Sequence, residues 1–244
     1  QLFDIKMTGV VVKDIFDFIE EETGQVAVNL IYPSWVIYSN GFQSRHYIRV
    51  ALDYSLNVLL ALIVFAFTWP IILITAVLIY LEDGHKKGGT IFYKQTRVGM
   101  DGNLFEIIKF RSMRQDAEKD GAQWASKTDS RVTKIGHALR KYRIDELPQL
   151  FNVFKGEMDF VGPRPERPEF VKELIKEIPY YNHRHNVKPG LTGWAQLNYP
   201  YGSSVNDSLE KLKFDLYYIK RRSILLDLLI LVRTIEIVLF GKGR

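Results

Sequence analysis

Cysteine is missing from all 244 residues of the sequence. Disulfide bonds, thiolate metal sites and cysteine nucleophiles are therefore excluded, although the cellular compartment stays open. The common nucleotide motifs are missing too, since there is neither Gly-x-Gly-x-x-Gly nor a phosphate loop ending in Gly-Lys-Ser/Thr. Aromatic and basic residues occur together at 217–222 without any nucleic-acid module around them, so we expect no nucleic-acid partner.

Charged residues of both signs are common in the sequence, apart from a few apolar stretches. The 33 basic and 28 acidic residues leave a net charge of +5. A mild basic excess suits phosphate ligands or an anionic membrane face, and identifies neither by itself. Residues 1–22 mix acids with apolar residues, which is unlike a cleavable secretory signal. The sequence begins at Gln1 rather than at a methionine, so we expect it to be part of a longer protein.

The stretch Val58–Leu81 contains no charged residue. A helix needs roughly 20 apolar residues to cross a bilayer, so the length permits a membrane span. Basic residues flank both ends, with Arg45 and Arg49 before it and Lys86 and Lys87 after it. The positive-inside rule places both ends on the cytoplasmic side.

Pro70 lies near the middle of this stretch and is expected to bend or break the helix. One interpretation is a re-entrant helix–break–helix that dips into one leaflet, with Thr68 bonded to a freed carbonyl. The alternatives are an ordinary kinked transmembrane helix and a buried helix of a soluble core. The residues alone leave the three open.

The last segment, Ile224–Phe240, is also apolar but is interrupted by Asp227, Arg233 and Glu236. This pattern is poor for a membrane span. It favours a helix that lies in the headgroup layer or packs on the first apolar helix. An ordinary core helix is the alternative.

The first part of the sequence looks like a separate piece. We expect a strand at Val10–Val12, a helix over Asp14–Thr23 closed by Gly24, and a strand at Val26–Ile31. A linker follows over residues 33–41.

A β-hairpin is predicted after the apolar stretch, from Thr90–Val98 and Asn103–Phe110 with glycines between them. Ser112–Ser130 is polar and indicates a connection or a loose helix. Further helices are expected at Val132–Lys141, Asp145–Phe154, Pro168–Ile178 and Ser208–Arg221. The fold class predicted is therefore mainly α with a small β-hairpin.

Asp145 and Glu146 are adjacent carboxylates within a strongly basic run. Asp145 suits the N-cap of the following helix, which would give it a purely structural role. The chemical alternative is that a carboxylate there stays ionised and acts as a nucleophile towards phosphorus. Glu146 is a hard oxygen ligand that suits Mg²⁺, or else a solvated acid of the first turn.

Several basic residues are candidates for binding the phosphates of a substrate. Arg164 stands between two prolines that restrict its backbone. The alternative for Arg164 is a surface turn. The candidates are Lys109, Arg111, Arg140, Arg164 and Lys188.

Taken together, six stretches resemble the bacterial sugar transferases, which are monotopic phosphoglycosyl transferases (polyprenol-phosphate hexose-1-phosphate transferases). The matching stretches occur in family order over roughly residues 46–244. They are the apolar segment with Pro70, Phe92–Gly99, Ile108–Met113, Asp145–Val153, Met158–Pro165 and Lys188–Gln196. Trp69 departs from the pattern, because many members carry serine before the proline.

This resemblance implies a monotopic membrane protein with a re-entrant helix and amphipathic interfacial helices, on the cytoplasmic face of the bacterial inner membrane. It implies transfer of a sugar 1-phosphate from a UDP-sugar to undecaprenyl phosphate with release of UMP, which starts an exopolysaccharide, capsule or O-antigen unit. Asp145 would be the nucleophile and Glu146 a magnesium-associated partner, with Arg140 and Arg164 meeting phosphates. A homodimer of the full-length protein is a further expectation.

The resemblance also divides the sequence. Residues 1–44 would be the tail of an upstream dinucleotide-binding-like domain and linker, 45–83 the re-entrant segment and 84–244 the catalytic domain. Two other functions stay open, namely a non-catalytic membrane scaffold for polysaccharide assembly and a basic module that binds anionic lipid.

Overall fold

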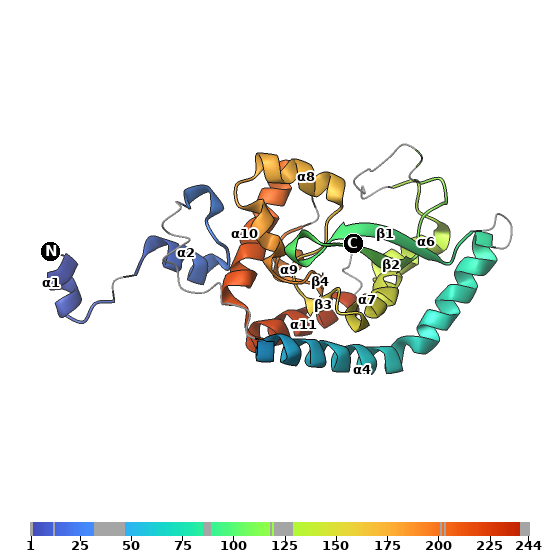
Figure 1. The fold of residues 1–244 in the computed structure, drawn as a ribbon, viewed down its shortest axis with the longest axis horizontal. Helices are drawn as coiled ribbons and strands as arrows, with labels where there is room; N and C mark the ends of the chain where they lie inside the picture. Colours follow the sequence, from blue (N-terminus) through green and yellow to red (C-terminus); the bar gives the residue numbers. More distant parts are fainter. Residues whose placement is uncertain are drawn as a thin grey trace.

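The computed structural model describes residues 2–11, 13–31, 47–84, 89–117, 119, 129–200, 202 and 204–239. This part of the chain is mainly helical, as predicted (Figure 1). Its α-helices are α1 (Leu2–Met7), α2 (Ile15–Thr23), α4 (Tyr47–Ile79), α6 (Lys134–Lys141), α7 (Leu150–Phe154), α8 (Pro168–Glu177), α9 (Trp194–Asn198), α10 (Val205–Arg221) and α11 (Ile224–Leu239). Short 3₁₀ helices are η1 (Val28–Leu30), η3 (Met100–Gly102), η4 (Ile144–Gln149) and η5 (Tyr181–Asn186), and a π-helical turn (η2, Tyr80–Gly84) follows α4.

The predicted β-hairpin is confirmed. Strands β1 (Phe92–Val98) and β2 (Leu104–Phe110) pair antiparallel. The turn between them places Asp101 at φ 57° and Gly102 at φ 78°. Glycine adopts this left-handed conformation without strain, which explains why the glycine at 102 ends the turn.

A second pair of short strands was not predicted. β3 (Asp159–Val161) and β4 (Gly190–Thr192) run parallel. They approach so closely that a side chain at Gly190 would place its Cβ 2.1 Å from the backbone nitrogen of Gly162. Gly162 and Gly190 therefore allow the segments around β3 and β4, which are distant in the sequence, to lie against each other.

The amino-terminal predictions are partly wrong. The helix expected to end at Gly24 is confirmed as α2, capped by Asp14 and closed by Gly24 at φ 63°. The strand expected at Val26–Ile31 is wrong, because residues 28–30 form η1 instead. Val10 and Val11 form no strand, and Val12 lies outside the described residues.

The remaining predicted helices appear close to their expected positions, as α6, α8 and α10. The helix expected over Asp145–Phe154 instead divides into η4 and α7. The linker at 33–41 and most of the connection over Ser112–Ser130 lie outside the described residues.

The apolar helix α4 is continuous through Pro70. The break predicted at Pro70 is therefore wrong, although the axis of α4 changes direction in its middle part (Figure 1). Pro70 cannot donate to the carbonyl of Ala66. The Thr68 hydroxyl does not reach that carbonyl, since it donates to Val64 O at 2.8 Å. A hydroxyl that donates to the carbonyl four residues earlier favours a bend of the helix rather than a break.

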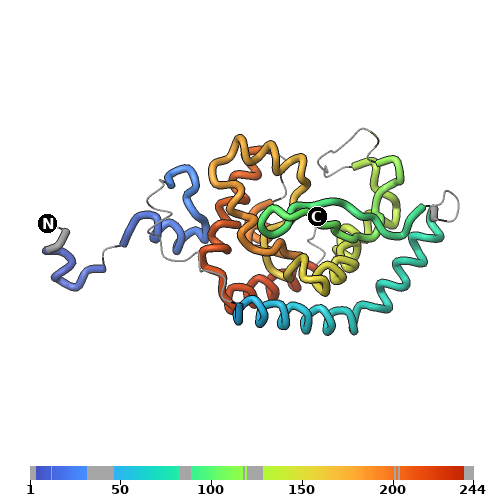
Figure 2. Tube along the Cα trace, viewed as in Figure 1, coloured from blue at the N-terminus to red at the C-terminus, as the bar shows by residue number. Residues whose placement is uncertain are grey.

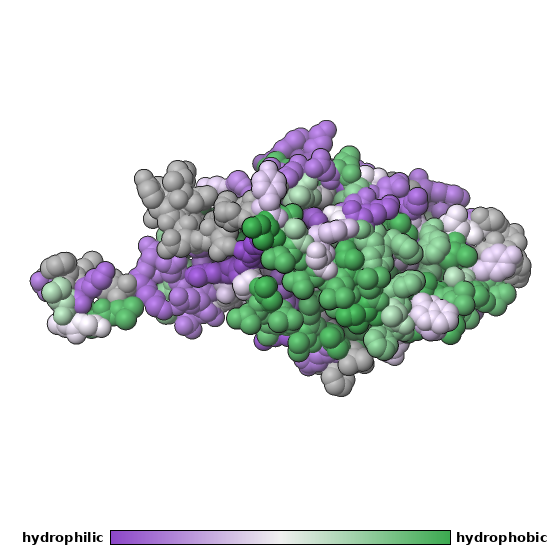
Figure 3. All heavy atoms as spheres, turned by 60° about the horizontal axis from the view of Figure 1, so that its bottom comes forward, coloured by the Kyte–Doolittle hydropathy of each residue, from purple (hydrophilic) through white to green (hydrophobic). Residues whose placement is uncertain are grey.

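The helical stretch Tyr47–Glu82 is long and apolar enough to cross a membrane by length and composition. Only 11% of its most apolar window is buried, so a helix inside a soluble core does not fit. Apolar side chains of α11, among them Leu225 at 79% and Val232 at 64%, are also exposed. Figure 3 shows a broad apolar surface on the side of the molecule where α4 and α11 run.

The first half of α4 is attached to the body of the protein by polar contacts. The Tyr54 hydroxyl donates to the carbonyl of Phe154 at 2.8 Å, and the buried backbone N–H of Phe160 donates to Asn57 Oδ1 at 2.7 Å. Phe154 ends α7, which directly follows η4, and Phe160 lies in β3. The first half of α4 is therefore fixed next to the η4–α7 segment and next to β3.

The far end of α4 is attached to the same body. Ile79 is buried in a cluster with Phe110 of β2 and Leu139 of α6. Just beyond it, Glu82 Oε1 accepts a hydrogen bond from the N–H of Ile135 at 3.2 Å. Figure 2 follows α4 along the body from one attachment to the other.

Candidate active site

The 3₁₀ helix η4 that carries Asp145 and Glu146 is held against the β-hairpin by one buried side chain. Asn152 in α7, with no exposed surface, donates from Nδ2 to the carbonyl of Glu106 at 2.7 Å and accepts from the N–H of Ile108 at 3.2 Å. It thereby satisfies two groups of β2. The acidic pair consequently lies beside the strand that carries Lys109.

Asp145 does not cap a helix. It lies inside η4, whose preceding residue Arg143 has the left-handed φ of 53° and makes no side-chain capping bond. Among the described residues, no hydrogen bond or ion pair reaches the Asp145 carboxylate. The capping alternative is therefore wrong, and the positive φ at Arg143 is a strained conformation of the kind found at functional sites.

Glu146, by contrast, is surrounded by cations. Its carboxylate lies 2.9 Å from Arg164 Nη2, 3.6 Å from Arg143 Nη1 and 3.7 Å from Lys109 Nζ. The Glu146 side chain is only 15% exposed. The Glu146 carboxylate is thus fixed in an ion-pair network, whereas the Asp145 carboxylate is available to react.

The environment separates the pKa values of the two acids. Burial, and then the neighbouring Glu146 charge, raise the pKa of Asp145 to about 6 against the pull of Lys109, Arg140 and Arg164. Burial also raises the pKa of Glu146, but Arg164, Lys109 and Arg143 overcome it and hold that pKa well below its usual range. Asp145 is therefore an ionised, poorly compensated carboxylate at neutral pH.

One of the cations around Glu146 has a shifted pKa as well. Burial lowers the pKa of Lys109 to about 8, and Glu146 offsets only part of that effect. Lys109 still carries its charge at neutral pH.

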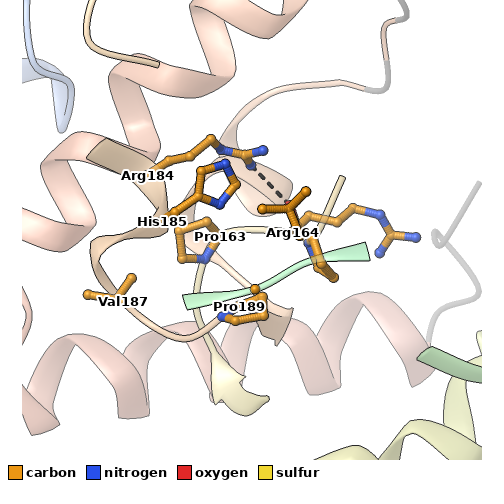
Figure 4. Close-up of a pocket in the computed structure, with 9 residues that line it drawn as sticks. Pro163, Arg164, Arg184, His185, Val187 and Pro189 are labelled. Carbon is orange, nitrogen blue, oxygen red and sulfur yellow. Dashed lines mark hydrogen bonds between the residues drawn. The ribbon is translucent and has the colours of Figure 1, made fainter. Parts of the chain in front are cut away.

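Arg164 is positioned by a second, deeper ion pair. Buried Arg184 of η5 binds Asp215 of α10 at 2.9 Å and also donates to the carbonyl of Arg164 at 3.0 Å. Figure 4 shows Arg184 directed at the Arg164 backbone, while the Arg164 guanidinium points the other way. The prolines at 163 and 165 restrict the same segment, so the guanidinium is held towards Glu146.

The basic residues predicted for the site do not all meet there. Lys109 and Arg164 contact Glu146, and Arg140 lies near enough to Asp145 to lower its pKa. Lys188 is located elsewhere, 3.9 Å from Asp159 and over the ring of Tyr54. The guanidinium of Arg111 is buried against Gly89. Phosphate binding by any of these residues stays a prediction.

The sequence of the chain matches a known protein family. The family model described as "Bacterial sugar transferase" matches residues 48–241, which include η4, both short sheets, α10 and nearly all of α4. The chain belongs to this family. The resemblance read from the six sequence stretches is thereby confirmed.

Curated members of the bacterial sugar transferase family are similar over most of the chain. UDP-N-acetylgalactosamine-undecaprenyl-phosphate N-acetylgalactosaminephosphotransferase of Aeromonas hydrophila is 47% identical over 78% of the chain and 44% of its own length. UDP-glucose:undecaprenyl-phosphate glucose-1-phosphate transferases of Xanthomonas campestris pv. campestris and Escherichia coli (strain K12) are 37% and 34% identical, over 95% and 96% of the chain. The chain spans 47% and 49% of these two, so it covers just under half of each relative.

Sequence reasoning missed two cations of this sugar transferase site. Arg143 pairs with Glu146, and Arg97 of β1 lines a hollow together with Lys109 and Arg164. Arg143 lies two residues from Asp145 in the basic run, which was a usable signal. Arg97 stands in the Phe92–Gly99 stretch quoted for the family resemblance, but nothing in its spacing indicated the hollow.

The fit of a magnesium ion depends on oxygens from outside the chain. No group of three His, Cys, Asp or Glu side chains that could hold a metal occurs within the described part of the chain. Glu146 already faces three cations. A site made only of protein ligands therefore does not fit, whereas one carboxylate combined with phosphate oxygens does.

Proposed function

We propose that the chain transfers a sugar 1-phosphate from a UDP-sugar to undecaprenyl phosphate through an aspartyl-phosphosugar on Asp145. The observation that carries this proposal is the asymmetry of the acidic pair. Glu146 is paired with three cations, while Asp145 is ionised and has no ion pair with any described residue. A carboxylate of this kind is a suitable nucleophile towards phosphorus.

In the first step, an Asp145 carboxylate oxygen attacks the β-phosphorus of the UDP-sugar. The bond from that phosphorus to the oxygen bridging the two phosphates breaks, and UMP leaves with that oxygen. Lys109, Arg164 and Arg140 would offset the charge on the diphosphate. Such charge compensation is the main catalytic means available in phosphoryl transfer.

In the second step, an oxygen of undecaprenyl phosphate attacks the same phosphorus. The bond between Asp145 and phosphorus breaks, which restores the carboxylate and yields a lipid diphosphate sugar. This product would start an exopolysaccharide, capsule or O-antigen repeat unit.

Magnesium would take part as a complex with the substrate. Glu146 would supply a carboxylate ligand and the diphosphate would supply the others, since magnesium is commonly held in this way. When bound, the ion would neutralise charge on the diphosphate.

We further propose that α4 is re-entrant and holds the protein on one leaflet. Both ends of α4 are attached to the same body, through Asn57 and Phe160 at the start and through Glu82 and Ile135 at the end. A straight span would carry the two ends to opposite sides of the bilayer, which these contacts oppose. The flanking basic residues favour the cytoplasmic face of the bacterial inner membrane.

The position of the acidic pair supports work at the lipid boundary. η4 and α7 both contact α4, and the ring of Phe151 meets that of Phe65 edge-on at 6.5 Å. Phe151 is still 47% exposed. A lipid phosphate lying along α4 would therefore arrive close to the nucleophile.

Transfer of radiolabel from a panel of UDP-sugars to undecaprenyl phosphate tests this function. Because the relatives' names specify different sugars, the panel includes UDP-glucose and UDP-N-acetylgalactosamine. We expect transfer from at least one donor by the wild type and by the exposed-loop control Asp101→Asn, and none by Asp145→Asn. A scaffold predicts no transfer by any of the three, and a module for anionic lipid predicts that UDP-sugars do not bind.

A further inference from the structure

Gln149 is a buried residue of the site with an unsatisfied donor. The residue is only 4% exposed, and its buried Nε2 has no hydrogen-bond partner among the residues that the structure describes. A buried donor left unpaired is unfavourable, because it has lost its hydrogen bonds to water without replacing them. Such a group in a native fold calls for a partner that arrives from outside.

Gln149 lies on the same face of the turn as Glu146. The two residues are three apart in η4, a 3₁₀ helix in which side chains at i and i+3 eclipse each other. Gln149 also lines a hollow with Lys109 and Arg164, the two cations that contact Glu146 from β2 and from the segment after β3. The hollow therefore shares two cations with the acidic site.

A second unsatisfied donor faces this region. Arg97 also lines the hollow, and its buried Nε has no hydrogen-bond partner within the described part of the chain. Its other nitrogens bind Gln95 Oε1 at 2.5 Å and the carbonyl of Pro165 at 3.2 Å, which fix the guanidinium in place. The charged and amide groups that line the hollow are thus three cations and one carboxamide.

The chemistry and size of the hollow restrict what it can hold. Positive charge and free N–H groups suit an anionic acceptor, because a sugar hydroxyl would also bring a proton that needs its own acceptor. The space is that of a water-sized group. It is too small for a uracil or a pyranose ring but sufficient for one phosphoryl oxygen.

We propose that Gln149 and Arg97 form an oxyanion pocket for one non-bridging phosphoryl oxygen of the group transferred through Asp145. This inference rests on the proposed function. In the pocket, Gln149 donates from Nε2 and Arg97 from Nε, while Lys109 and Arg164 compensate the charge. Donors fixed in place before the reaction stabilise the negative charge on the phosphoryl oxygens in the transition state without reorganising.

The decisive variant is Gln149→Met, which keeps the length of the side chain and removes the donor. We expect kcat for sugar-phosphate transfer to fall about 100-fold, as removal of one oxyanion donor does elsewhere. We expect KM for the UDP-sugar to change less than about 3-fold, since the donor acts mainly in the transition state. The thermal midpoint without ligand should not fall, because the substitution removes an unsatisfied group. The exposed control Gln115→Met should retain wild-type rates.

Gln149→Glu is the second variant, because it retains the shape of glutamine but offers an acceptor. We expect it to lose at least as much activity as Gln149→Met. If either variant transfers sugar phosphate at the wild-type rate, the pocket is not used and the inference is overturned. A lower ligand-free midpoint in both variants with kcat unchanged would likewise assign Gln149 to packing alone.

Binding of inorganic phosphate separates this inference from the proposed function. We expect phosphate to raise the thermal midpoint of the full chain and of Gln115→Met, and to raise that of Gln149→Met much less. If no UDP-sugar is a donor for the wild type, the proposed function fails while this comparison still tests the pocket. Equal stabilisation of all three proteins by phosphate would contradict the pocket.

Discussion

At the scale of single residues, the site depends on a difference between two neighbours in the sequence. Burial and the charge of Glu146 raise the pKa of Asp145, whereas Arg164, Lys109 and Arg143 outweigh burial and lower the pKa of Glu146. The sequence singled out this pair and named Lys109 and Arg164 among the candidate cations, and the structure places both beside Glu146. It could not exclude the capping role of Asp145, because that depends on the left-handed backbone at Arg143.

Sequence reasoning was weaker for residues whose partners are distant. Lys188 was expected among the phosphate-binding residues, but it pairs with Asp159. The contact of Arg184 with Asp215, which fixes Arg164, joins residues 31 positions apart. Pairings of this length depend on how η5 and α10 pack, and no local pattern in the sequence reports that.

The pKa values predict a bell-shaped pH dependence of transfer. The Asp145 carboxylate must be ionised to attack, so the rate should fall as the pH drops through about 6. Lys109 must be protonated to compensate charge, so the rate should fall again above about 8. A pH profile of kcat/KM measures both limbs.

Glu146→Gln tests the origin of the acidic limb. Removing the Glu146 charge removes a cause that raises the pKa of Asp145, so the acidic limb should move to lower pH even if the residual rate is small. The exposed control Glu173→Gln should leave the limb in place. An unchanged limb in Glu146→Gln would mean that another group controls it.

At the scale of secondary-structure elements, strong local signals were interpreted correctly. The glycines at 99 and 102 predicted the hairpin, and Gly24 predicted the end of α2. The strand expected at Val26–Ile31 was wrong because Val26 donates to the carbonyl of Lys213 and the chain then turns into η1. Pro70 bends α4 without breaking it, since α4 continues on both sides.

The attachment of α4 leads to a prediction about stability. Asn57→Leu would remove the acceptor for the buried N–H of Phe160, at a cost of about 1–3 kcal/mol. We expect the thermal midpoint in detergent to fall by about 2–4 °C for each kcal/mol lost. The neighbouring control Leu56→Ala, at an exposed position, should change the midpoint much less. No decrease in Asn57→Leu would show that this contact does not hold α4.

At the scale of the whole molecule, a folded body lies along one side of a long apolar helix. Exposed apolar side chains of α4 and α11 form the surface seen in Figure 3. The sequence predicted both apolar elements but not that the two ends of α4 attach to one body. That attachment depends on β2, α6 and β3 packing together, which the sequence does not specify locally.

The absence of cysteine makes the membrane topology directly measurable. Single substitutions Tyr47→Cys and Leu81→Cys place a thiol near each end of α4 at exposed positions. We expect an impermeant maleimide to label both in inverted membrane vesicles and neither in intact spheroplasts. Phe67→Cys, at the exposed middle of α4, should resist labelling in both preparations. Labelling of the two ends from opposite sides would identify an ordinary transmembrane helix.

The most direct test of the whole account is mass spectrometry of the protein quenched during turnover with a UDP-sugar and without undecaprenyl phosphate. The account predicts the added mass of one phosphosugar on the peptide that contains Asp145, its absence in Asp145→Asn and its loss when lipid phosphate is added. Sugar transfer to lipid by a wild-type protein that never carries this mass would contradict the covalent role of Asp145.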